Sequence, residues 1–154
     1  MVKLSMPAGL MIEAAIAGGV EGDHLIEVIR EKKISALSHI GKSEESWQSF
    51  FKYAEEHWED IVLAIKNGFT FKFITIKGLQ NLLLTRISFK EENLKIGDSW
   101  LELKLNESQL TFLLSRIPHQ WLFIKQEDSE SPYNYRAVLA QRHKVTCKKA
   151  SRKE

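Results

Sequence analysis

The sequence has one cysteine and no long apolar run, and each shortage excludes a class of protein. Cys147 has no cysteine partner within the chain, which excludes an intramolecular disulfide and a metal site built from several thiolates. The most apolar window, Met6 to Val20, is too short to cross a bilayer and contains Glu13. Glu13 and the acidic residues after this window also argue against a signal peptide. We therefore predict a cytoplasmic protein with no membrane partner.

Sequence motifs for catalysis are lacking as well. The chain contains no HExxH pair, no nucleophile elbow and no Walker phosphate loop. Its five histidines are scattered and form no recognised zinc motif. We therefore expect no metal, no cofactor and a non-enzymatic function. An enzyme whose site is assembled from dispersed residues stays open, because such a site leaves no spacing pattern.

The length and composition are those of one globular domain. The chain has 154 residues, of which 44% are hydrophobic and 27% are charged. A chain of this size buries about two-thirds of its unfolded surface, so a substantial core is expected.

The charge is distributed unevenly along the chain. Residues 136–154 contain seven Lys or Arg and one Glu, a net of +6, and the total of +2 therefore leaves −4 for residues 1–135. A basic terminal segment can neutralise phosphates through contacts that do not depend on base sequence. The candidate polyanion contacts, all within a tail (142–154) that we expect to be flexible, are Arg142, Lys144, Lys148, Lys149, Arg152 and Lys153.

Two segments that lie 30 residues apart are nearly the same. Leu82 to Ile87 corresponds to Phe112 to Ile117, and Leu94-Lys95 corresponds at the same offset to Ile124-Lys125. An internal repeat of this kind constrains the fold, because both copies are expected to form the same local structure.

The hydrophobic period places the first half of the chain in helices. Pro7 can open a helix in an N-terminal helical region, residues 1–42. Large apolar residues then recur at steps of three and four over 44–66, which predicts one long helix capped by Ser43. At residue 69 the period changes to two, which predicts a strand.

Residues 69–126 follow the order β-α-β-β-α-β. Gly97-Asp98 predicts a hairpin turn between the two halves, and Asn106 with Gln109 resembles a capping box at the second helix. Each half is one βαβ unit. We therefore predict an α+β fold in which the N-terminal helices pack on a ferredoxin-like βαββαβ domain made of two repeats.

The predicted boundaries divide the chain into three regions. The α+β domain spans 43–141 and ends with a further strand over 133–141, expected at the edge of the sheet beside 120–126. The helical region 1–42 precedes this domain, and the basic tail follows it.

One face of the predicted sheet is covered by the two repeat helices, and the opposite face is open. We expect the open face to carry Trp100, Trp121, Phe123 and Lys72, and these residues form our candidate interaction surface. We nevertheless favour the interpretation that the helix over 44–66, or the N-terminal hairpin, covers this face, because the aromatic stripe of that helix has no other obvious surface to pack against.

These observations favour a non-enzymatic, intracellular binding or regulatory protein that acts through protein–protein contact. Its partner would be another protein or a second copy of the chain. The alternative is a nucleic-acid-binding protein that uses the basic tail and stacks bases on the aromatic sheet face. Glu102 argues against this alternative, because a carboxylate on the third strand would repel phosphate.

Overall fold

The computed structural model describes residues 1–86, 91–127 and 132–140. The helices are α1 (Met6–Ala17), α2 (Gly22–Glu31), α3 (Glu44–Glu56), α4 (Trp58–Asn67), α5 (Ile76–Arg86) and α6 (Glu107–Arg116). The strands are β1 (Val2–Leu4), β2 (Phe69–Phe71), β3 (Leu94–Ile96), β4 (Trp100–Leu103), β5 (Trp121–Lys125) and β6 (Tyr135–Leu139). Short 3-10 turns cover Ile34–Leu37 and Glu91–Asn93. The mixture of helix and sheet confirms the α+β prediction.

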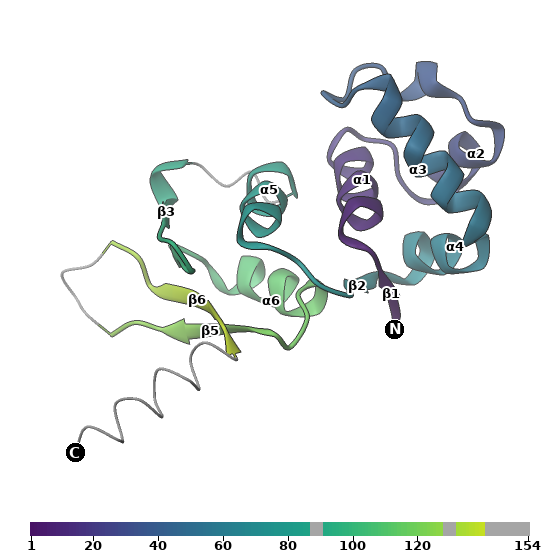
Figure 1. The fold of residues 1–154 in the computed structure, drawn as a ribbon. Coiled ribbons are helices and arrows are strands. Elements are labelled where there is room, and N and C mark those ends of the chain that lie inside the picture. The colour runs from purple at the N-terminus through teal and green to yellow at the C-terminus, as the bar shows by residue number, and fades with distance from the viewer. Residues whose placement is uncertain (87–90, 128–131, 141–154) are drawn as a thin grey trace.

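The elements are arranged in two groups (Figure 1). Helices α1 to α4 lie together on one side, and α5, α6 and the strands β3 to β6 lie on the other. The short strands β1 and β2 lie between the two groups. Within the part of the chain that the structure describes, no helix is long and apolar enough to cross a membrane.

Local capping chemistry explains where the helices begin and end. The Ser43 hydroxyl accepts a hydrogen bond from the Ser46 amide at 3.1 Å and caps α3 as predicted. Asn106 and Gln109 form the predicted capping box at α6. The long helix predicted over 44–66 is interrupted at His57, whose backbone (φ −129°, ψ 38°) is not helical, so it forms α3 and α4.

The aromatic stripe of this helical pair faces the N-terminal helices. Trp47, Phe50 and Phe51 are buried. Helix α3 packs against α1, and α4 packs against α2 and both short strands. The stripe is therefore buried within the N-terminal group, where it contributes to the same apolar core as the repeat helices. The prediction that this helix covers the open face of the sheet is wrong, because α3 and α4 lie away from β3 to β6 (Figure 1).

The first strand of the repeat pairs with a partner that its sequence did not predict. Strand β2 is parallel to β1, with Val2 opposite Phe69 and Leu4 opposite Phe71. Both phenylalanines are fully buried, and the backbone of Gly9 in α1 lies against their rings. Since β2 packs beneath α1 and pairs outside the larger sheet, the ferredoxin-like sheet is not confirmed.

The larger sheet is antiparallel, with the strand order β3-β4-β6-β5. The strand predicted over 133–141 is β6, which lies between β4 and β5 rather than at the edge. The side chain of Asn134 accepts from the Leu105 amide at 2.8 Å and donates to the Leu105 carbonyl at 2.7 Å. The backbone N–H of Asn134 donates to the Leu103 carbonyl at 3.0 Å. Together these three hydrogen bonds hold the start of β6 beside β4.

The hairpin between the repeat halves forms, but its turn residues are Asp98 and Ser99 rather than the predicted Gly97-Asp98. The Gly97 amide donates to the Trp100 carbonyl at 2.8 Å, and β3 and β4 pair on either side of this turn. The division of the chain at residue 42 stays a prediction, and the basic tail lies outside the described residues.

Candidate functional site

The residues predicted to form one interaction surface lie in three places. Residues directly opposite on paired strands project to the same face of a sheet. Trp121 and Phe123 therefore belong to the face that contains the buried Ala137, whereas Trp100 lies on the other face. Lys72 follows β2, outside this sheet, and is exposed.

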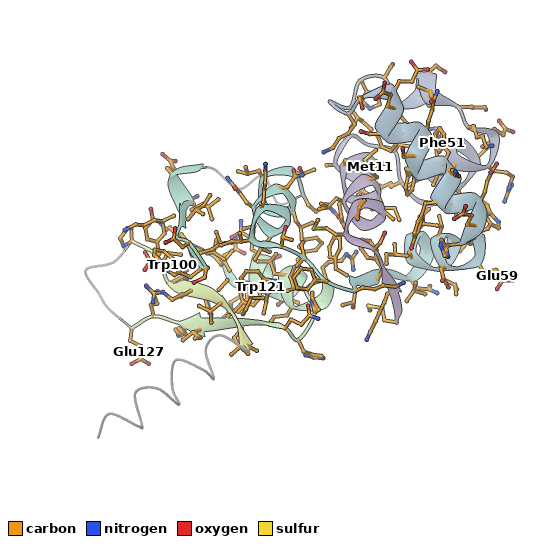
Figure 2. The ribbon with its side chains drawn as sticks, in the orientation of Figure 1. Met11, Phe51, Glu59, Trp100, Trp121 and Glu127 are labelled. Atoms are coloured by element: carbon orange, nitrogen blue, oxygen red, sulfur yellow. The ribbon has the colours of Figure 1, made fainter. Side chains whose placement is uncertain are left out.

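The two tryptophans lie on opposite faces of the sheet, opposite consecutive residues of β6, Val138 and Leu139. In Figure 2 Trp100 lies farther from the N-terminal helices than Trp121 does. Trp121 is only 5% exposed, and its indole N–H donates to the Ile74 carbonyl at 2.8 Å. Trp121 therefore joins the sheet to the segment after β2 and is not available to a partner.

The outer face of the four-stranded sheet carries apolar side chains where solvent contact usually selects polar ones. One row across the strands consists of Trp100, Val138 and Leu122, and Ile124 stands in the next row. All four are partly exposed. These residues, with Lys95, Glu102 and Arg136, define the outer sheet face.

Charged side chains hold the tryptophan of this face in place. The guanidinium of Arg136 lies 4.8 Å from the centre of the Trp100 ring, and its Nη2 donates to Glu102 Oε1 at 3.1 Å. The Trp100 ring also lies against the backbone of Gly97, where an added Cβ would overlap with the ring. Trp100 is thus held in a partly exposed position, with an arginine and a carboxylate beside it.

The candidate polyanion contacts of the tail, residues 142–154, fall outside the described residues, so the geometry neither supports nor weakens that assignment. Arg136, the remaining cation of the basic C-terminal stretch, pairs with Glu102.

A second charged site was not predicted from the sequence. The side chain of Glu13 in α1 is fully buried, and it faces two arginines. The Arg116 Nε donates to Glu13 Oε1 at 2.8 Å. The Arg86 Nε lies 2.8 Å from Glu13 Oε2 but makes no hydrogen bond there, so this contact is an ion pair. We call these three residues the Glu13 triad.

Aromatic rings complete the surroundings of the triad. The Phe112 ring lies 5.3 Å from both guanidinium groups, and the Phe69 ring lies 4.9 Å from that of Arg116. Rings at this distance attract cations through their quadrupole. The arginine side chains are accordingly well enclosed, with exposed fractions of 33% for Arg86 and 15% for Arg116.

The internal repeat explains why two arginines meet one carboxylate. Arg86 and Arg116 occupy the same position in the two copies, at the ends of α5 and α6. Glu13 is an acidic residue inside an otherwise apolar helix. A buried carboxylate that stays charged is paired with a cation, so Glu13 was a signal for such a pair in the sequence, but its partners could not be identified there. No family model, curated protein or solved structure matches this chain.

Proposed function

We propose that this chain is an intracellular, non-enzymatic binding or regulatory protein that acts through protein–protein contact at its outer sheet face. The observation that carries the proposal is the apolar row of Trp100, Val138 and Leu122 on a face that no described helix is seen to cover. Contiguous apolar surface marks interaction sites more often than isolated apolar residues do.

The side chains of this face are of the types that dominate binding energies. Tryptophan and arginine are enriched among the residues whose truncation weakens interfaces most. Trp100 and Arg136 stack on each other, so their rotamers are already ordered in the free protein. Since little entropy is then lost on association, the contact can be formed at lower cost.

The charges on this face favour a second copy of the chain as the partner. Lys95, Glu102 and Arg136 lie side by side on three neighbouring strands, with alternating sign. In a two-fold interface each contact occurs twice, because the same surface is used by both copies. Glu102 of each copy can then lie against a cation of the other, beside the apolar row.

The oligomeric state of the full chain, measured by light scattering and sedimentation equilibrium, tests this proposal. We expect a dimer that Leu122→Lys dissociates. Burial of one leucine contributes about 1.5–3 kcal/mol and counts twice in the dimer, so the dimer Kd should rise roughly 100-fold or more.

The matched control is Leu114→Lys, the same change at an α6 leucine that is 59% exposed. It should leave the dimer intact, and circular dichroism should show both variants folded. A monomeric wild-type chain, or equal behaviour of the two variants, would refute the proposal. Retention of DNA or RNA that is lost when residues 142–154 are removed would instead support the nucleic-acid alternative, which rests on the net charge of +6 over 136–154.

A further inference from the structure

The two arginines of the Glu13 triad also line a hollow on the protein surface. The hollow has a volume of about 510 Å³ and is bounded by the end of α4, the start of α2 and Phe69. Glu13 is not part of its lining. Arg86 and Arg116 therefore border both the buried carboxylate of Glu13 and this open space.

The orientation of the arginines leaves donors available to this space. Both use Nε toward Glu13. Each guanidinium also carries two terminal nitrogens. Among the described residues, the hydrogen bond found for these nitrogens is the long one, 3.4 Å, from Arg116 Nη1 to the Phe69 carbonyl.

No further carboxylate of the described residues balances the charge of the triad. Two guanidinium groups share one carboxylate, which leaves a net charge of +1 on a largely enclosed cluster. The rim of the hollow does not change this balance, because the exposed Lys66 and Glu21 have opposite charges. An excess charge that is partly removed from water is costly unless a counter-ion accompanies it.

We propose that this hollow binds a small oxyanion, a carboxylate or phosphate group, between Arg86 and Arg116. The guanidinium fork matches the spacing of two oxygens in either group, and such contacts are strengthened where water is partly excluded. The hollow is larger than one phosphate group, so the ligand is a small organic anion. This site lies apart from the outer sheet face and does not depend on the proposed protein contact.

Titration of the full chain with inorganic phosphate, followed by nuclear magnetic resonance of the arginine Nε–Hε signals, tests the site. Citrate tests the carboxylate, and chloride at the same ionic strength is the control. Phosphate or citrate should move the signals of Arg86 and Arg116 in a saturable manner, and chloride should not. If neither oxyanion moves these two signals, the proposal is refuted.

Variants then test the chemistry without removing the buried carboxylate. Arg86→Lys keeps the charge but removes the fork, and we expect affinity to fall about tenfold. The control is Arg30→Lys, on α2 beside Trp58 and outside the hollow, which should not change the affinity. Equal affinities for the two variants would show an adventitious surface anion only.

The rim residues supply a second, independent pair of variants. Both are exposed and lie outside the triad, so folding is not in question. Lys66→Gln should weaken oxyanion binding about threefold, and Glu21→Gln should tighten it by a similar factor, because each changes the charge of the rim by one. If both changes leave the affinity unaltered, the anion does not bind in this hollow.

Discussion

Replacing Glu13 with glutamine tests whether the Glu13 triad stabilises the packing of α1 against the repeat helices α5 and α6. Glutamine keeps the size of the side chain and removes its charge. Arg86 and Arg116 would then face each other without a counter-ion in a site where Glu13 is 0% exposed. The perturbation is therefore electrostatic, and it creates no cavity.

The size of the effect follows from the enclosure of the three side chains. Removal of one partner from a buried ion pair costs about 3–5 kcal/mol. Because the amide of glutamine can still accept from one arginine, we expect the lower value, about 3 kcal/mol, in the free energy of unfolding. For a domain of this length that corresponds to a fall of about 6–12 °C in Tm.

Urea unfolding followed by tryptophan fluorescence measures this change, since the chain has four tryptophans. The matched control is Glu55→Gln, which removes an ion pair with Lys32 on the surface, where both side chains are more than half exposed. We expect that control to cost less than about 1 kcal/mol. If Glu13→Gln destabilises the protein no more than Glu55→Gln does, the buried triad does not stabilise the fold.

A triple replacement separates the charge from the packing. Glu13→Leu with Arg86→Met and Arg116→Met exchanges the triad for apolar side chains of similar length. Such exchanges are often neutral or stabilising, because no charge remains to be desolvated. We expect the triple variant to be more stable than Glu13→Gln, and the opposite order would contradict the electrostatic explanation.

Two further substitutions test the packing on either side of the triad by the same urea assay. Gly9→Ala should destabilise the protein by about 1–3 kcal/mol, because an added Cβ would overlap with the buried Phe71 ring, whereas Gly41→Ala, with no atom within 4 Å of its Cβ, should cost less than about 0.5 kcal/mol. Equal effects of the two glycine variants would contradict the overpacking argument. Trp121→Phe should cost about 1–3 kcal/mol, because the Ile74 carbonyl loses its 2.8 Å hydrogen bond. An unchanged stability would show that water replaces the indole N–H.

Features that depend on neighbouring residues could be predicted from the sequence. The capping box at Asn106 and the cap at Ser43 were found where expected, and the hairpin turn lies one residue after its predicted position. Each is decided by side chains within a few residues of one another, so a short stretch of sequence contains the whole interaction.

The faces of the sheet could be predicted only in part. Trp100, Trp121 and Phe123 were assigned to one face, but Trp100 lies on the outer face and the other two lie on the covered one. The alternation within β5 separates its residues into two faces, but only the pairing with β6 decides which face meets the core. A shift of register by one residue would have exchanged them.

The sequence by itself determined the caps of α3 and α6, the hairpin to within one residue and the two matching helices of the repeat, because these depend on local propensity and on capping. Tertiary structure alone decided that β2 pairs with β1, that β6 lies inside the sheet and that Glu13 meets Arg116 across 103 residues of chain. These contacts join distant segments, and they are chosen by the burial of the whole core and by the charge that Glu13 requires there.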